Sequence, residues 1–209
     1  MQERKLMELA EAAGNIAIVG HVRPDGDCVG SCLAVCNYIT EQYPEKTVDV
    51  YLETPPVKFS YLKQFERICS DPETGKQYDL CICLDSGDRE RLGKNVVYLD
   101  TAKTSICIDH HITNQGYGAA NFVKADAELL YDFLDEEKIS KEVAECIYTG
   151  ILHDTNVFKN SNTTERTMQV AGAMMAKGIN FSRIIDESFY KKTYVQNQIM
   201  GRAVLESVL

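Results

Sequence analysis

The sequence predicts an α/β protein in which a mostly parallel sheet is covered by helices on both faces and is followed by a helical C-terminal part. Short apolar runs rich in β-branched residues, typical of buried strands, alternate with amphipathic segments as far as Asp109. From Asp126 onward the pattern is almost entirely helical. Strands separated by helices favour parallel pairing, because the crossover between parallel strands is usually a helix that covers the sheet.

The N-terminal half contains the expected strands. An amphipathic segment, Leu6 to Ala13, predicts a helix that Gly14 can terminate. Strands are then expected at residues 16–20, 47–52, 78–85 and 104–109, with a short extra strand at 96–99. Helices are expected at residues 28–43 and, after the break at two prolines, around 59–67.

The C-terminal half contains only helical patterns. Helices are expected near residues 126–137, 140–152, 164–177, 181–190 and 193–208, with an interruption at 154–162. The last stretch is amphipathic and carries no terminating signal. We therefore expect one domain over residues 1–190. Residues 191–209 are expected to form a linker helix toward a second domain that is absent from this chain.

The composition restricts the class of partner. The chain has 209 residues and a formal net charge of −9, with 31 acidic against 22 basic residues. Proteins that grip long nucleic acids usually carry a basic surface, so long DNA is not an expected partner. A short anionic substrate is compatible with this charge, because bound metal ions would invert it locally.

The sequence also predicts a cytoplasmic protein. No apolar run approaches the roughly 20 residues of a membrane span, so no membrane partner is expected. The segment MQERKLMELAEAAG lacks the apolar core of a signal peptide. Eight cysteines occur without any CxxC pair, and Cys28, Cys32 and Cys36 recur on one helix face. This pattern favours small buried hydrophobes over disulfides.

Residue types that ligate metals follow several of the expected elements. They are His21, Asp25 and Asp27 after the first strand, Asp85 and Asp88 after the third, Asp109, His110 and His111 at the end of the next, and Asp154 after a later helix. Because the carboxyl ends of parallel strands meet at one edge of a sheet, these side chains are expected to converge. Clustered carboxylates are costly to bury without cations. Carboxylates and imidazoles without thiolate favour Mn²⁺ or Mg²⁺, and the surplus of ligands suggests the pair of ions used in phosphoryl displacement.

Each of these residues taken alone has an ordinary structural explanation. His21 or Asp25 could be a turn or cap residue, and Gly26 suits a turn for backbone reasons. Adjacent histidines also occur by chance, and His153, on a helical stretch, is assigned a structural role. The coincidence favours a site, because three of the four histidines fall at the predicted sheet edge.

Four segments, HVRPDGDCVGS, LDSGD, DHHITN and YTGILHDTNVF, carry a resemblance to a known family. In this order and approximate spacing they resemble the four signature motifs of DHH phosphoesterases. They are most similar to the subfamily of nanoRNases and 3′-phosphoadenosine 5′-phosphate (pAp) phosphatases. The resemblance runs from about Ala13 to the final helix. It implies a catalytic domain over residues 1–190, and a DHHA1-like domain, absent from this chain, beyond the linker helix 191–209.

The resemblance also implies roles for individual residues. One ion would be held by His21, Asp25 and Asp85, and a second by Asp27, Asp85, His110 and Asp154, so that Asp85 bridges both. His111 would contact the phosphate and assist the reaction, and Asp109 would orient the histidines. Asn114 and Ser161 are candidate substrate contacts. A turn is the alternative for Asn114, and a helix cap for the segment 161–167, with Thr163 or Thr164 as the N-cap.

The function implied is that of a two-metal, Mn²⁺-dependent phosphoesterase, with Mg²⁺ as the alternative ion. Its substrates would be short oligoribonucleotides or pAp, attacked by a metal-activated water. A cyclic-dinucleotide phosphodiesterase and an inorganic pyrophosphatase are alternatives on the same fold. The non-enzyme alternative is a nucleotide-binding module that is inactive without its second domain. Pairing of two copies through the linker region is expected by analogy alone.

Two departures from the family pattern bear on the site. Ala125, Asp126 and Ala127 run almost directly into Glu128, where several small hydroxyl residues are expected, so a loop near the site is expected to be trimmed. Asn156 stands where glycine is common. Asparagine tolerates the left-handed backbone conformation, so this change is compatible with the same turn.

Overall fold

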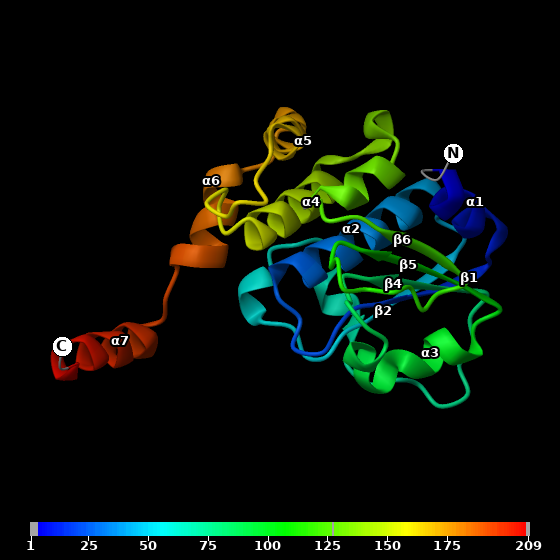
Figure 1. Ribbon diagram of the computed structural model, residues 1–209, viewed down its shortest axis with the longest axis horizontal. Coiled ribbons are helices and arrows are strands. Elements are labelled where there is room, and N and C mark those ends of the chain that lie inside the picture. The colour runs from blue at the N-terminus through cyan, green and yellow to red at the C-terminus, as the bar shows by residue number, and fades with distance from the viewer. Residues whose placement is uncertain (1–3, 127, 208–209) are drawn as a thin grey trace.

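A six-stranded, wholly parallel sheet lies between helical layers in the computed structural model, which describes residues 4–126 and 128–207 (Figure 1). The strand order is β3-β2-β1-β4-β5-β6. The strands are β1 (Asn15–Val19), β2 (Thr47–Tyr51), β3 (Ile68–Cys69), β4 (Leu80–Leu84), β5 (Thr104–Asp109) and β6 (Ala120–Val123). The fold class predicted from the sequence is therefore confirmed.

The described α-helices follow the expected alternation. They are α1 (Arg4–Ala12), α2 (Gly26–Gln42), α3 (Val96–Thr101), α4 (Lys141–Asp154), α5 (Glu165–Ala176), α6 (Phe181–Ile185) and α7 (Tyr194–Glu206). Shorter turns of 3₁₀-helix are η1 (Val57–Phe59), η2 (Phe65–Arg67), η3 (Glu90–Asn95), η4 (Leu129–Phe133) and η5 (Glu136–Lys138). The segment η6 (Asp186–Tyr190) is a π-helix.

The central strand β4 is buried on both faces, so it is apolar throughout rather than alternating with polar residues. In β4, Leu80, Ile82 and Leu84 enter the core shared with α2 and α4. Cys81 and Cys83 point the other way, into a smaller core under α3. All eight cysteines are free thiols, and all but Cys69 are buried, as the sequence predicts.

Helix α2 lies between the sheet and α4 and carries the first part of the site. The Asp25 carboxylate caps its N-terminus by accepting hydrogen bonds from the amides of Asp27 and Cys28. Helices α2 and α4 approach closely at Gly30. A Cβ atom there would lie 2.7 Å from the Cys146 carbonyl oxygen, so only glycine fits. This close packing fixes the start of α2 against the end of α4.

The order in which successive strands are added to the sheet reverses between β1 and β4. From β1 the order runs outward through β2 to β3, and from β4 it runs through β5 to β6. Ligands of open α/β sheets bind at such a switch point, beyond the carboxyl ends of the strands. A ligand is therefore expected beside the residues that follow β1 and β4, with β5 next to them.

Several expected elements are wrong or incomplete. Residues 96–99 belong to α3 rather than to a strand, because a short apolar run fits a buried helix equally well. The helix expected at 59–67 is replaced by two 3₁₀ turns separated by residues 60–64, where Gln64, with φ of 67°, interrupts a helix. The strands β3 and β6 were not predicted. β3 has two residues, and β6 is a half-exposed edge strand, so neither shows a buried apolar run.

The C-terminal part differs in two further places. The helix expected at 126–137 is replaced by η4 and η5, and Ala127 lies outside the described residues. The helix expected at 181–190 is α6 followed by the π-helix η6. The other predicted helices and strands agree with the structure to within a few residues at their ends.

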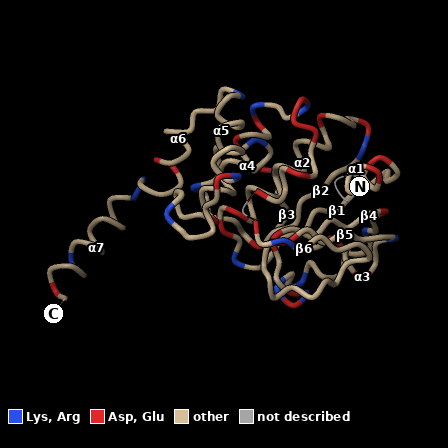
Figure 2. The backbone as a smooth tube through the Cα atoms, turned by 45° about the horizontal axis from the view of Figure 1, so that its top comes forward, with Lys and Arg blue, Asp and Glu red and all other residues tan. Residues whose placement is uncertain are grey.

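The last helix, α7, begins at a capping box in which the Thr193 hydroxyl accepts from the Gln196 amide. None of its described residues is buried, and it extends away from the rest of the chain (Figures 1 and 2). Its role as a linker stays a prediction, and residue 208, included in the expected helix, lies outside the described part. Within residues 4–126 and 128–207, no helix combines the length and apolar character needed to cross a membrane.

Candidate active site

The loop after β1 delivers the first imidazole. His21 is 3% exposed, and its Nδ1 donates to the carbonyl oxygen of the next residue, Val22, at 2.8 Å. This bond leaves Nε2 directed at two carboxylates, 3.8 Å from Asp25 and 3.4 Å from Asp85. A backbone acceptor on one ring nitrogen is the usual way in which a protein orients a metal-binding histidine.

Asp85, directly after β4, lies between the imidazoles of His21 and His110. Its Oδ2 is 3.4 Å from His21 Nε2, and its Oδ1 is 3.1 Å from His110 Nε2. The residue is 6% exposed and has a left-handed backbone with φ of 49°. This conformation is uncommon outside glycine, and aspartate and asparagine tolerate it best. The switch point of the sheet thus places one carboxylate between His21 on one side and His110 on the other.

His110 follows β5 and joins the second set. Its Nε2 is 3.3 Å from Asp27 Oδ2, and its Nδ1 is 3.4 Å from Asp154 Oδ2. One ligand atom from each of Asp27, His110 and Asp154 lies within 4.8 Å of the others. The six residues predicted as metal ligands are therefore neighbours, brought together from β1, α2, β4, β5 and α4.

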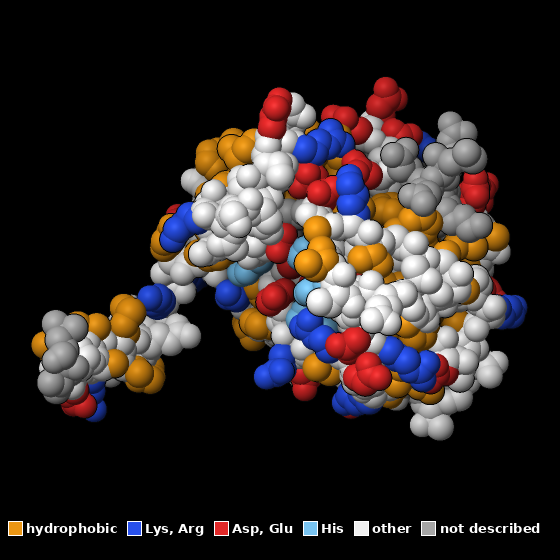
Figure 3. All heavy atoms as spheres, in the orientation of Figure 1, with side chains coloured by type: hydrophobic (Ala, Val, Ile, Leu, Met, Phe, Trp, Pro, Cys, Tyr) orange, Lys and Arg blue, Asp and Glu red, His pale blue; other side chains and the backbone are white. Residues whose placement is uncertain are grey.

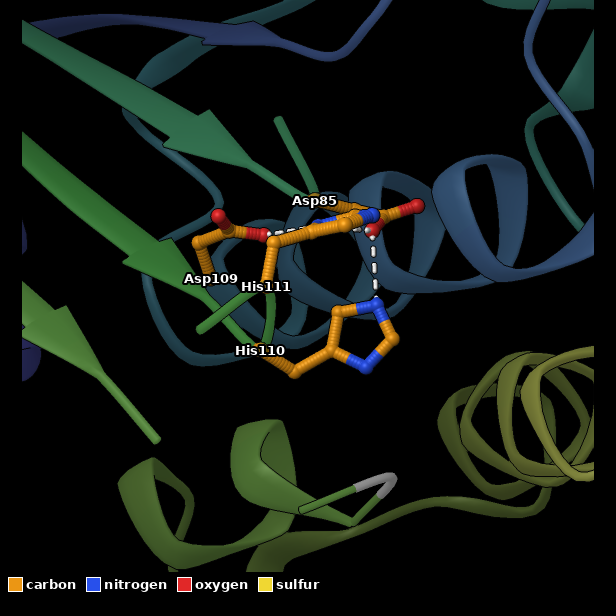
Figure 4. A group of neighbouring side chains, drawn as sticks. All are labelled: Asp85, Asp109, His110 and His111. Carbon is orange, nitrogen blue, oxygen red and sulfur yellow. Dashed lines mark hydrogen bonds and ion pairs between the residues drawn. The ribbon is translucent and has the colours of Figure 1, made fainter. Parts of the chain in front are cut away.

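His111 is held by hydrogen bonds that link it to Asp109 and, through Asp109, to Asn114. His111 Nδ1 lies 2.7 Å from Asp109 Oδ1 (Figure 4). The other Asp109 oxygen accepts from Asn114 Nδ2 at 2.7 Å. Burial opposes the charge of Asp109, but the bonds from His111 and Asn114 keep its pKa below the usual value. His111 is the more exposed member, with 35% of its side chain open to solvent.

The side-chain amide of Asn114 forms its hydrogen bonds within the protein. Its Nδ2 donates to Ser86 O as well as to Asp109, and its Oδ1 accepts from Gly116 N at 2.7 Å. Its side chain is buried. Of the two alternatives left by the sequence, the turn role accounts for these contacts, and the substrate contact stays a prediction.

The segment after Asp154 turns back onto the site. Asn156, Val157 and Phe158 all have positive φ, of 49°, 57° and 61°, and form a left-handed turn. The chain then returns so that Asn162 Nδ2 donates to Asp154 Oδ2 at 2.9 Å. Asn162 is thus a support for a predicted metal ligand, a role that the sequence did not reveal.

The structure also places Ser161, Thr164, Asp88 and His153. Ser161 is exposed, and its substrate contact stays a prediction. The N-cap of α5 is Thr164, whose hydroxyl accepts from the Thr167 amide. Asp88 is exposed and accepts from the Arg91 amide in a turn, outside the cluster. His153 packs between aromatic rings, and burial together with the Lys58 charge lowers its pKa to about 4.

The electrostatics of the cluster call for cations or protons. Burial works against charged imidazoles, yet hydrogen bonds to carboxylates raise the pKa of both His21 and His110 to about 12. Burial and the charge of Asp85 raise the pKa of Asp27 well above its usual value. Without metal ions, the cluster is therefore stable only when it holds protons at atoms that would otherwise be ligands.

A thiol that the sequence did not assign to the site lies beside it. Cys28 Sγ falls within 4.8 Å of ligand atoms of His21 and Asp85. Burial and a hydrogen bond with Cys32 raise the pKa of this thiol well above its usual range. An ion bound there would have to displace the proton of Cys28, as it would that of His21, so Cys28 is a further candidate ligand beside His21 and Asp85.

The site reaches the surface. In the space-filling view, histidine side chains appear next to acidic side chains near the middle of the face shown (Figure 3). A small pocket nearby is lined by carboxylates of Asp27, Asp85, Asp109 and Asp126 and by His110. A ligand can therefore approach the cluster from solvent.

Comparison with known proteins agrees with the fold. A crystal structure of an exopolyphosphatase-related protein from Bacteroides fragilis matches with a TM-score of 0.90 and 23% identity, over 100% of this chain and 66% of that chain. A putative family II inorganic pyrophosphatase of Methanococcus jannaschii matches with a TM-score of 0.60 and 16% identity, over 82% and 60% of the two chains. At these identities the matches show the fold alone.

Sequence relatives are more specific. The chain is 31% identical over 184 residues to the bifunctional oligoribonuclease and PAP phosphatase NrnA of Bacillus subtilis, which covers 84% of this chain and 57% of that protein. It is 30% identical to the protein of the same name from Thermus thermophilus, over 96% of this chain and 62% of that protein. The chain thus spans about three fifths of these relatives. Since the model of the DHH family, N-terminal domain, matches residues 15–151, well over half of the sequence, the chain belongs to the DHH family.

Proposed function

We propose that this chain is the catalytic domain of a two-metal phosphoesterase that hydrolyses phosphate esters of small nucleotides. The observation that carries the proposal is the position of Asp85, whose two oxygens face His21 and His110 at 3.4 Å and 3.1 Å. A carboxylate shared by two sets of ligands is the arrangement expected for a pair of ions. The relatives named as oligoribonucleases and PAP phosphatases support short RNA and pAp as substrates.

The donor set fits divalent cations of the Mn²⁺ type. His21, Asp25 and Asp85 would hold one ion, and Asp27, Asp85, His110 and Asp154 the second. Imidazole nitrogens together with carboxylate oxygens suit Mn²⁺ better than Mg²⁺, which prefers oxygen ligands alone. When bound, such ions lower the pKa of a water molecule and neutralise charge on phosphoryl oxygens.

The chain's own contribution to the reaction centres on His111. In its charged form the ring donates from Nδ1 to Asp109, and Nε2 is the nitrogen left to donate a hydrogen bond to a phosphoryl oxygen. Asp109 fixes the direction of the ring, and Asn114 in turn holds Asp109. A donor held in place in this way stabilises negative charge as it develops, without the cost of reorientation.

The test is a comparison of four substrates. We expect hydrolysis of pAp and of a two-nucleotide RNA with Mn²⁺, and none after chelation of the metal. Faster hydrolysis of pyrophosphate or of a cyclic dinucleotide would replace the proposed substrate class. Two bound Mn²⁺ ions without turnover of any of the four would favour the nucleotide-binding module.

Metal binding is expected to release protons. The pKa of His21 and of His110 is raised to about 12, above the unfolded value of 6.5, so both rings are charged near neutrality in the metal-free protein. Both must lose a proton to act as ligands, so Mn²⁺ affinity should rise between about pH 6 and 8, with release of about two protons or more per chain. Calorimetry in buffers of different ionisation enthalpy measures this number, and proton-neutral binding would contradict the prediction.

The same shifts set the pH dependence of stability without metal. Because the folded pKa of each histidine is raised, its contribution is fully present below pH 6.5 and is lost as the pH rises toward 12. Mn²⁺ should therefore stabilise the protein more at the alkaline end of this window, which thermal unfolding at several pH values can measure.

A further inference from the structure

His153 makes contacts that the proposed chemistry does not use. It belongs to the last turn of α4, one residue before Asp154. Its ring stacks on Phe189 at 4.4 Å between centroids with a 25° angle, and meets Phe59 edge-on at 5.0 Å. Its Nε2 is buried and has no hydrogen-bond partner among the described residues. The ring is therefore held by packing rather than by polar contacts.

The third neighbour of the ring is the backbone between two predicted metal ligands. A Cβ atom on Gly26 would lie 2.1 Å from His153 Cδ2 and 2.2 Å from Cγ, far inside contact distance. The φ of Gly26 lies outside the left-handed region, so steric contact, not backbone conformation, excludes a side chain here. Gly26 separates Asp25 from Asp27, and it is the first residue of α2.

The two aromatic neighbours are themselves tied together. Lys58 Nζ donates to Ser188 O at 2.9 Å and lies 4.9 Å from the centre of the Phe59 ring. This links η1 to the π-helix η6, which carries Phe189. π-helical segments in proteins often occur at functional sites. The His153 ring is thereby wedged between a fixed aromatic pair and the Gly26 backbone.

We propose that His153 is a positioning residue for the metal site, with the Gly26 backbone resting on its ring. The contact sets the position of Asp25 and Asp27 at the start of α2 relative to Asp154 at the end of α4. The inference rests on the proposed two-metal site, since it concerns the placement of that site's ligands. It concerns metal affinity and not the chemical step.

The test is a double-mutant cycle read out by Mn²⁺ affinity. Gly26→Ala should weaken Mn²⁺ binding by about tenfold or more, because the new methyl group must displace the loop that carries the ligands. His153→Ala should weaken binding less, since it removes the support without adding a clash. The double variant removes the three ring atoms that lie nearest to the new methyl group, so binding should return to the level of His153→Ala.

Matched controls separate positioning from general destabilisation. Gly172→Ala lies in α5 with open space around its Cβ position, and it should leave Mn²⁺ affinity unchanged. Thermal unfolding of the metal-free variants reports folding, and calorimetry with Mn²⁺ reports the site. A His153 that is merely structural would lower the unfolding temperature and leave Mn²⁺ affinity intact, which would overturn the inference.

Additive effects of the two substitutions on Mn²⁺ affinity would also overturn it. Failure of the proposed function can be distinguished from failure of this inference by the behaviour of the wild-type chain. If the wild-type chain binds Mn²⁺ but hydrolyses no nucleotide, the proposed activity fails, while the cycle still tests the positioning role. If the wild-type chain binds no Mn²⁺, both are overturned.

Discussion

Asp85→Asn is expected to reduce Mn²⁺-dependent hydrolysis of pAp and of dinucleotide RNA by about a thousandfold or more. Among the described residues, Asp85 is the one whose carboxylate faces both His21 and His110. Asparagine has no negative charge and only one side-chain oxygen. Each of the two proposed ligand sets would therefore lack the carboxylate that Asp85 supplies. Loss of several kcal/mol of charge stabilisation by bound ions corresponds to such a factor, since about 1.4 kcal/mol is tenfold.

The substitution should leave the fold intact, which makes the result interpretable. Asparagine tolerates the left-handed backbone that position 85 requires, with φ of 49°. Circular dichroism and metal-free thermal unfolding check this expectation. Asp100→Asn is the matched control, because Asp100 forms an exposed ion pair with Arg89 away from the cluster. Wild-type turnover by Asp85→Asn would refute the shared-carboxylate arrangement.

His111→Gln is expected to lower kcat about 100-fold to 1,000-fold while Mn²⁺ stoichiometry and affinity stay near wild type. Removing one preorganised donor to a developing anion costs about this much in enzymes. Glutamine is close in size and keeps a polar end, but it cannot supply a charged donor held by Asp109. Steady-state kinetics with pAp and calorimetry with Mn²⁺ together measure the two effects.

The alternative for His111 is a role as a metal ligand. Ligand atoms of Asp85, Asp109, His110 and His111 lie within 4.8 Å of one another, so this set could also hold an ion. Loss of a bound Mn²⁺ in His111→Gln would favour that role and contradict the proposed phosphate contact. Asp109→Asn, which weakens the hold on the ring, should produce a smaller loss of kcat in the same direction if His111 is the donor.

The parts of the site that could be predicted from the sequence are those fixed by local pattern. Asp85 and His110 each follow a buried apolar strand, and the carboxyl ends of parallel strands share an edge. The alternation of apolar strands and helices predicts that edge without knowledge of any contact. The family resemblance, confirmed by the matching family model, added the pairing of the ligands into two sets.

The remaining features depend on contacts between distant parts of the chain. Asn162 reaches Asp154 across a left-handed turn, and although Asn156 is compatible with that turn, the residue types of Val157 and Phe158 do not signal it. The packing of His153 involves Gly26, Phe59 and Phe189, which no sequence spacing relates. The helix α3 was mistaken for a strand because its short apolar run fits either conformation, and only its place under the sheet decides.

The left-handed turn at residues 156–158 has a consequence for protein design. A designer would write glycine at each of these positions, since a side chain in this conformation costs about 1–2 kcal/mol per residue. Val157 and Phe158, however, pack their side chains against the core. Fully burying a side chain of this kind contributes about 1.5–3 kcal/mol, so for these half-buried residues the packing lost with glycine offsets much of the relief of the backbone. Glycine is therefore expected to stabilise the turn at the exposed Asn156 rather than at Val157 or Phe158.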